Sequence, residues 1–208
     1  LAGILGNTQL IKRKLAAIKI SDQDGMNQAL GFVEEEARRA NHIINDLLKF
    51  ARQDKPPETK IDLTERIRRS LLMLRPLLEQ ENVSIEEEIL TKPLVCIANG
   101  DQIHEVFINL IQNAIHAMKD KPKKHIKIKF SESSQQAVLS IHDSGYGISP
   151  NVKEHIFEPF FTTKKIGEGT GLGLAVCHGI ILNHHGKLEV DSIPNEWTEF
   201  KISLPISL

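Results

Sequence analysis

Four glycines at alternating positions, Gly167, Gly169, Gly171 and Gly173, run directly into a helical pattern over residues 171–184. Exposed backbone N–H groups beside a helix N-terminus form a binding site for anions. The spacing fits neither the dinucleotide fingerprint GxGxxG nor the phosphate loop GxxxxGK[ST]. The glycine pattern therefore excludes the two commonest nucleotide-binding motifs. It indicates either a different anion-binding motif or a plain flexible loop.

The first 53 residues show helical periodicity in two stretches. Apolar residues recur at mostly three- and four-residue steps from Ile4 to Ile18 and from Leu30 to Ala51. Between them, Asp22-Gln23-Asp24-Gly25 predicts a polar turn. Two helices cannot bury both apolar stripes alone. We therefore expect an antiparallel helical hairpin, residues 1–53, that pairs with a second copy in a four-helix bundle.

The remainder of the chain predicts a second domain. Residues 54–60 are polar, contain two prolines and are expected to form a linker. Helical patterns cover 63–79, 101–118 and 171–184, and strand-like segments cover 83–89, 125–131, 136–142, 187–192 and 198–205. Either Asp62 or Thr64 is expected to cap the first of these helices. Three helices over a mostly antiparallel sheet make an α+β fold, a two-layer α/β sandwich over residues 61–208.

Composition narrows the functional classes. The chain has 208 residues and a formal net charge of -1, which gives no electrostatic reason to expect nucleic acid or an anionic membrane as a partner. Two cysteines far apart in sequence indicate a reducing compartment. There is no signal peptide and no apolar run that could span a bilayer. We expect a cytoplasmic fragment of a longer protein, attached to a membrane only through upstream segments.

A polar stripe is predicted along the helix over 101–118. Glu105, Asn109, Asn113 and His116 fall within an arc of roughly 80°, opposite a wide apolar face. Amide and carboxylate oxygens are ligands that suit Mg²⁺. A solvated helix face would give the same pattern, although two asparagines in a helix interior, where asparagine is unfavourable, favour a site.

Two further segments carry candidate chemistry. Asp143-Ser144-Gly145-Tyr146-Gly147 follows a predicted strand, where an acid and two glycines allow a ligand to approach closely and a carboxylate to accept a bond from an exocyclic amine. An ordinary turn is the alternative. Phe157 to Lys165 places three phenylalanines beside the glycines, as in a mobile flap, and Lys164 could reach a phosphate. An ordinary surface loop is the alternative there.

These segments occur in a fixed order, and that order resembles the ATP-binding domain of sensor histidine kinases, in the superfamily shared with gyrase, Hsp90 and MutL. The resemblance covers residues 61–208 and implies the Bergerat-type ATP-binding fold. Residues 105–113 resemble the N box, 143–147 the G1 box, 157–160 the F box and 169–174 the G2 box. The F box and the hairpin together favour kinases over the gyrase-like relatives.

The resemblance implies ATP and Mg²⁺ as cofactors. It gives Glu105 and Asn109 a catalytic role as metal ligands, and it implies that Asp143 binds the adenine amino group. The nucleotide contacts that it implies are Asn109, Asn113, His116, Asp143, Gly145, Gly147, Lys164, Gly169, Thr170, Gly171, Leu172 and Gly173.

The hairpin also resembles the family, because Leu1-Ala2-Gly3-Ile4 looks like the segment just after the phosphoacceptor histidine. By that resemblance the histidine lies shortly before Leu1, in a homodimer that passes the phosphoryl group to an aspartate of a response-regulator receiver domain. We therefore expect this fragment to bind ATP without autophosphorylating. Two alternatives stay open: a gyrase/Hsp90-type ATPase that uses Glu105 as its catalytic acid, and a non-catalytic nucleotide-binding dimerisation module.

Overall fold

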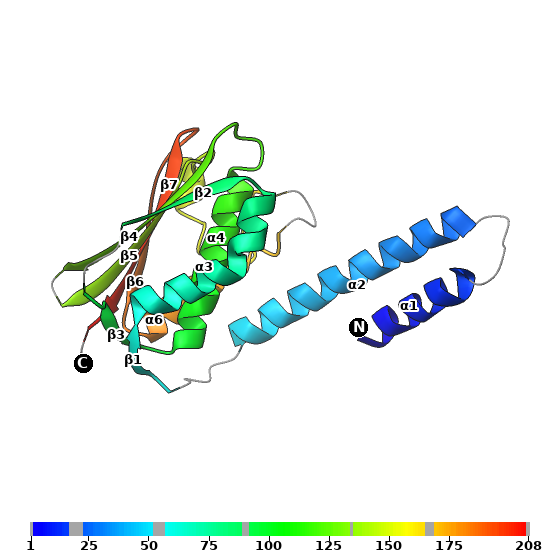
Figure 1. Ribbon diagram of the computed structural model, residues 1–208, viewed down its shortest axis with the longest axis horizontal. Helices are drawn as coiled ribbons and strands as arrows, with labels where there is room; N and C mark the ends of the chain where they lie inside the picture. The colour runs from blue at the N-terminus through cyan, green and yellow to red at the C-terminus, as the bar shows by residue number, and fades with distance from the viewer. Residues whose placement is uncertain are drawn as a thin grey trace. The chain divides into compact units, whose positions relative to one another are not determined.

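The chain is described by a computed structural model that covers residues 2–16, 23–51, 57–88, 92–133, 135–164 and 169–206. It divides into two compact units, shown in Figure 1. Residues 1–52 and 163–170 form one, which we call the helical unit, and residues 53–162 and 171–208 form the other, which we call the sandwich unit.

The helical unit contains two antiparallel helices, α1 (Ala2–Ala16) and α2 (Gln23–Ala51). Leu15 and Ala37 are buried between them, and an ion pair of 2.9 Å joins Lys12 Nζ to Glu34 Oε2. These contacts hold the two helices as the predicted hairpin. Within the described residues, no helix is long and apolar enough to cross a membrane.

The helix α2 begins earlier than the sequence pattern indicated. The predicted turn is wrong for Gln23, Asp24 and Gly25, which form the first turn of α2, and residues 17–22 lie outside the described part. A carboxylate near a helix N-terminus interacts favourably with the helix dipole, so Asp24 supports a helical start as well as a turn.

The sandwich unit contains four helices and seven strands in the part that the structure describes. The helices are α3 (Leu63–Gln80), α4 (Gly100–Ala117), α5 (Pro150–Lys153) and α6 (Gly173–Asn183). The strands are β1 (Thr59–Asp62), β2 (Val83–Glu88), β3 (Val95–Ala98), β4 (Lys124–Ser133), β5 (Gln136–Asp143), β6 (Lys187–Ile193) and β7 (Trp197–Pro205).

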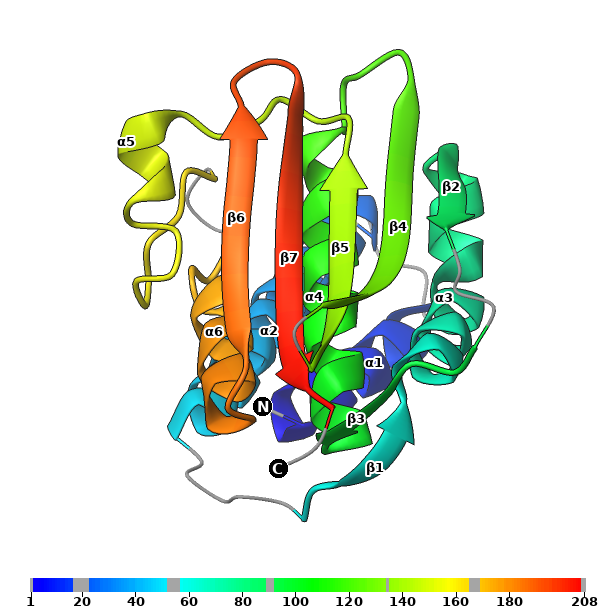
Figure 2. The same ribbon diagram turned by 90° about the vertical axis from the view of Figure 1, so that its left-hand side faces the viewer.

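Five strands form one mixed sheet in the order β2-β4-β5-β7-β6, with only the β2–β4 pair parallel. The helices α3, α4 and α6 cover one face of this sheet, as Figure 2 shows. The remaining strands, β1 and β3, pair antiparallel as a separate two-stranded sheet. The predicted α+β fold, a two-layer α/β sandwich preceded by a helical hairpin, is confirmed.

The core lies between the helical layer and the sheet. Phe107 and Ile111 on α4 are fully buried and pack in the same cluster as Ile128 on β4 and Ile141 on β5. Burying each such side chain contributes about 1.5–3 kcal/mol, so this apolar face fixes which side of α4 is turned away from the sheet. The polar stripe of α4 therefore lies on the side of the helix that faces away from this core.

Side-chain caps fix the starts of two helices. The Asp62 carboxylate accepts the N–H groups of Thr64 and Glu65, so the predicted cap of α3 is Asp62 and not Thr64. The Asn99 side chain caps α4 in the same way. The strand β1 begins at Thr59, two residues before the expected start of the second domain at residue 61.

Candidate nucleotide-binding site

The helix α4 presents its polar stripe away from the core. Glu105, Asn109 and Asn113 are half-buried and His116 is exposed, whereas the apolar side chains on the other face are buried. Glu105 and Asn109 lie one helical turn apart, so their oxygens face the same direction. Hard oxygen donors at this spacing fit a Mg²⁺ ion that keeps its other positions for water and phosphate.

Asp143, the last residue of β5, carries a buried carboxylate. The residue is 3% exposed, and its Oδ1 accepts a hydrogen bond of 2.9 Å from the Gly145 N–H. Burial raises the pKa of this carboxyl from 3.8 to about 6, although the Gly145 bond opposes the rise. A strongly shifted pKa of this kind is a mark of functional sites.

The turn after Asp143 needs glycine for steric reasons. A Cβ on Gly145 would lie 2.9 Å from the Ala117 Cβ, and a Cβ on Gly147 would lie 2.1 Å from the Ile193 carbonyl oxygen. Gly147 also has a φ of +64°, which disfavours other residues. The Tyr146 N–H donates to the Ala117 carbonyl over 3.2 Å. The turn is therefore packed against the C-terminal end of α4.

The other end of the candidate site is the start of α6. Gly171 has a φ of +67°, and its carbonyl accepts the Phe160 N–H over 2.9 Å. Leu172 is fully buried, so no part of this residue is open to solvent. A Cβ on Gly173 would lie 3.8 Å from the Asn109 Oδ1, which places the first residue of α6 beside the polar stripe.

The phenylalanine-rich segment before these glycines is tied to α6. The rings of Phe157 and His178 stack with centroids 4.8 Å apart. Phe160 has a φ of +68° and is 61% exposed, which is unusual for a residue with a Cβ and a large apolar ring. The sequence pattern identified these aromatic residues but gave no sign of the strained backbone at Phe160.

The structure thus brings together most of the residues that the sequence predicted. The helix α4 contacts the Asp143 turn through Ala117 at its C-terminal end, and Asn109 on its polar stripe lies beside the start of α6. Lys164, Gly169 and Thr170 belong to the helical unit and have no described position relative to this site. Sequence reasoning missed the Asn99 cap, although an asparagine directly before a helix is a recognisable signal.

Comparison with known proteins identifies the family. Residues 98–208 match the family described as histidine kinase-, DNA gyrase B- and HSP90-like ATPase, and residues 1–56 match the His kinase A (phospho-acceptor) domain. The chain belongs to the sensor histidine kinases. This confirms the predicted resemblance, and the phospho-acceptor match favours a histidine kinase over a gyrase-type ATPase.

The kinase has relatives of known sequence and structure. It is 31% identical over 212 residues to Sporulation kinase D of Bacillus subtilis (strain 168), a match that covers 100% of this chain and 39% of the relative. The catalytic domain of histidine kinase ThkA is 34% identical with a TM-score of 0.65, over 72% of this chain and 96% of that one. The chain spans well under half the length of the curated relatives that it matches.

A longer ThkA structure includes a second protein. ThkA in complex with the response regulator protein TrrA is 26% identical to this kinase, with a TM-score of 0.73 over 98% of this chain and 57% of that one. The similarity therefore extends across both units of the kinase chain.

Proposed function

We propose that this chain is the ATP-binding core of a protein-histidine kinase. The observation that carries the proposal is the buried Asp143 carboxylate at the C-terminal end of the polar stripe on α4. Its Oδ1 is engaged by Gly145, so Oδ2 is left to accept a hydrogen bond from the exocyclic amine of adenine. Gly145 and Gly147 shape the adenine pocket, because larger residues would displace the turn.

The phosphates extend from that end toward the start of α6. Glu105 and Asn109 hold Mg²⁺, and Asn113 and His116 contact the metal or the phosphates. Gly171, Leu172 and Gly173 bring the start of α6 to the phosphates, where the dipole of a helix N-terminus favours negative charge. The resemblance also assigns Lys164, Gly169 and Thr170 to nucleotide binding, and that assignment stays a prediction.

The reaction that this arrangement serves is phosphoryl transfer. Mg²⁺ held by Glu105 and Asn109 would supply charge neutralisation at the phosphates, and the residues around it would hold the γ-phosphoryl group in line with a histidine ring nitrogen. We assign that histidine to the phospho-acceptor hairpin of the family. The bond from the γ-phosphorus to the β-phosphate oxygen breaks as the N–P bond forms, and ADP leaves. The N–P bond breaks in turn when the phosphoryl group passes to an aspartate of a response regulator, the class of partner present in the ThkA complex.

The helical unit supports a homodimer. On α2, Phe32, Val33, Ile43, Ile44 and Leu47 are all exposed within this unit and fall within an arc of roughly 120°. A continuous apolar stripe of this kind is costly in water and is satisfied by a second copy in a four-helix bundle. We place the kinase core in the cytoplasm, where its two buried cysteine thiols would stay reduced.

Calorimetric titration of the chain tests the nucleotide proposal. We expect saturable binding of the ATP analogue AMPPNP in the presence of Mg²⁺, weaker binding with EDTA, and much weaker binding of the guanine analogue GMPPNP. Guanine carries a carbonyl where adenine has its amine, so it offers no donor to Asp143. Equal binding of the two analogues, or no saturation at millimolar AMPPNP, would contradict the proposal.

A further inference from the structure

His184 is a buried histidine that sequence patterns did not connect with the nucleotide site. It follows the last residue of α6 and is 2% exposed. Its Nε2 accepts a hydrogen bond of 2.9 Å from the backbone N–H of Asn99. The proton of the neutral ring is therefore on Nδ1, which donates to the Ile180 carbonyl over 2.8 Å. Both ring nitrogens are engaged, and one of them reaches another helix.

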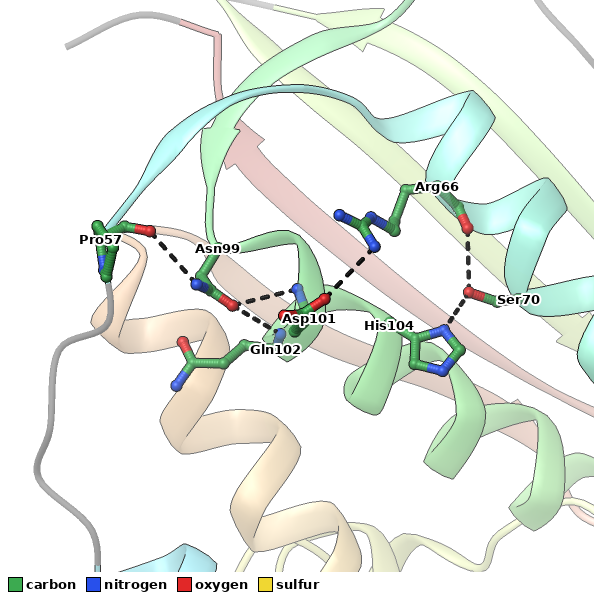
Figure 3. Close-up of polar contacts among 7 residues, drawn as sticks. All are labelled: Pro57, Arg66, Ser70, Asn99, Asp101, Gln102 and His104. Atoms are coloured by element: carbon green, nitrogen blue, oxygen red, sulfur yellow. Dashed lines mark hydrogen bonds and ion pairs between the residues drawn. The ribbon is translucent and has the colours of Figure 1, made fainter.

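The partner of His184 is the capping residue of α4. The Asn99 Oδ1 accepts the N–H groups of Asp101 and Gln102, and its Nδ2 donates to the Pro57 carbonyl over 3.3 Å, as Figure 3 shows. The backbone N–H of Asn99 donates to His184. Asn99 therefore connects the start of α4 with the end of α6 and with the segment that leads into β1. Asn99 thus connects the start of α4 to two other segments through its side chain and its backbone N–H.

The opposite face of the same helix start is held by α3. Arg66 forms an ion pair of 3.4 Å with Asp101, and Ser70 Oγ lies 2.6 Å from His104 Nδ1 (Figure 3). These contacts fix α4 against α3, but neither of them constrains α6. Of the contacts at this end, the one from His184 determines where α6 ends relative to α4.

Contacts along α4 and α6 show that the two helices run antiparallel, with the start of α4 beside the end of α6. Cys177 Sγ lies 3.8 Å from the Val106 carbonyl, seven residues from His184 on one helix and seven from Asn99 on the other. Farther on, Gly173 lies beside Asn109. At a rise of 1.5 Å per residue, Asn109 is about 15 Å from Asn99, and Gly173 is about 16 Å from His184. Because the distance from Asn99 to Asn109 matches the distance from His184 to Gly173, Gly173 lies level with the polar stripe.

We propose that His184 is a positioning residue of the nucleotide site. By tying the end of α6 to Asn99, it sets how far along α4 the glycines at the start of α6 are held, and so keeps Gly173 level with Asn109. It acts on the phosphate end of the site alone, because Asp143 is positioned by β5 and by the end of α4. The inference rests on the proposed function.

Two ligands separate this role from a general loss of structure. The chain and its variants would be titrated with AMPPNP and Mg²⁺, and separately with adenosine, with binding followed by NMR chemical shifts so that millimolar affinities are measurable. His184→Leu removes the acceptor for Asn99, and we expect it to weaken AMPPNP binding about tenfold while leaving adenosine binding unchanged. His184→Gln retains an acceptor of similar reach and should bind AMPPNP nearly as the wild type does.

A control for stability is provided by Ile128→Val on β4, a fully buried position outside both helices. It lowers stability without moving Gly173, so its affinity for both ligands should be unchanged. If His184→Leu does not fold, His184→Asn serves instead, because its shorter side chain does not reach Asn99. Equal losses for both ligands, no loss for either, or no recovery in His184→Gln would each overturn the inference. Failure of the wild type to bind AMPPNP would overturn the proposed function itself.

Discussion

The Asp143 carboxylate accepts the Gly145 N–H at 2.9 Å while only 3% of the residue is in contact with solvent. One backbone bond does not replace the water that a carboxylate loses on burial, so the pKa of Asp143 rises to about 6. The ionised form that an adenine amine requires is therefore costly in the empty site. Ligand binding and pH are coupled at this residue.

Nucleotide affinity should depend on the ionisation of Asp143. Below about pH 6 the carboxyl is protonated and loses part of its capacity to accept the adenine amine, so we expect the AMPPNP affinity to fall as the pH drops from 7.5 to 5. Calorimetric titration across this range measures the change. In Asp143→Asn the amide nitrogen presents a donor to the adenine amine, so binding should be weak at every pH. Binding that did not change with pH would contradict the assignment.

The same residue predicts an opposite effect on stability. The folded chain holds the Asp143 proton up to about pH 6, whereas the unfolded chain releases it near its ordinary value of 3.8. Stability is therefore lost as the pH rises from about 4 to 6. Above pH 6, Asp143→Asn should raise the free energy of unfolding by about 3 kcal/mol, and the difference should disappear as the pH falls below about 4. Urea unfolding at fixed protein concentration measures it.

Gly171→Ala should destabilise the fold. A Cβ there would lie 2.4 Å from the Phe160 carbonyl carbon, and the φ of +67° is unfavourable for alanine. We expect a loss of about 2 kcal/mol or more in urea unfolding. Gly179→Ala is the matched control, since a Cβ at that helical position meets nothing within 4 Å and should stabilise by about 0.5–1 kcal/mol. Equal stability of the two variants would contradict the packing argument.

Asn109→Ala should reduce the metal-dependent part of nucleotide binding. Loss of one oxygen donor is expected to weaken AMPPNP binding with Mg²⁺ about tenfold, or about 1.4 kcal/mol. With EDTA the variant and the wild type should bind alike. Gln80→Ala, an exposed position on α3, is the control and should bind normally. A loss of the same size in EDTA would exclude Asn109 as a metal ligand.

Ile44→Asp should separate the proposed homodimer. Ile44 is 44% exposed on the apolar stripe of α2, and a carboxylate there would be buried in a four-helix bundle. Light scattering after size-exclusion chromatography should give a monomer mass for the variant and a dimer mass for the wild type. Arg38→Asp is the control, because Arg38 is exposed on the side of α2 opposite this stripe, and that variant should remain dimeric. A wild-type chain that is monomeric at tens of micromolar would contradict the dimer.

The sequence predicted the long elements because their periodicity extends over several turns or strand residues. The strands β4 and β5 and the apolar face of α4 were predicted correctly, and Asp62 was one of the two caps expected for α3. The strands β1 and β3 were missed, since each has only four residues and pairs across a long sequence separation. The short helix α5 was missed for the same reason, as four residues show no period.

The candidate site likewise contains residues that local patterns predict and contacts that they do not. Asp143, Asn109 and Gly171 belong to local patterns, so their types and spacing predicted a site directly. The contact between Asn99 and His184 joins residues 85 positions apart and leaves no periodic trace. The burial of Asp143 was equally hidden, because a turn of this sequence occurs as often at a surface. These properties come from packing between elements.

The hydrogen bond from Phe160 to Gly171 fixes two points that lie eleven residues apart in sequence. Residues 161–170 are therefore bounded by neighbouring positions of the sandwich unit, so the core of that unit does not dictate their number. The entropic free-energy cost of closing such a loop grows only with the logarithm of its length, by about 0.6 kcal/mol for each doubling of the number of residues. This makes the segment a natural point of exchange, at which loops from other kinases or a fluorescent reporter could be grafted without redesigning the core.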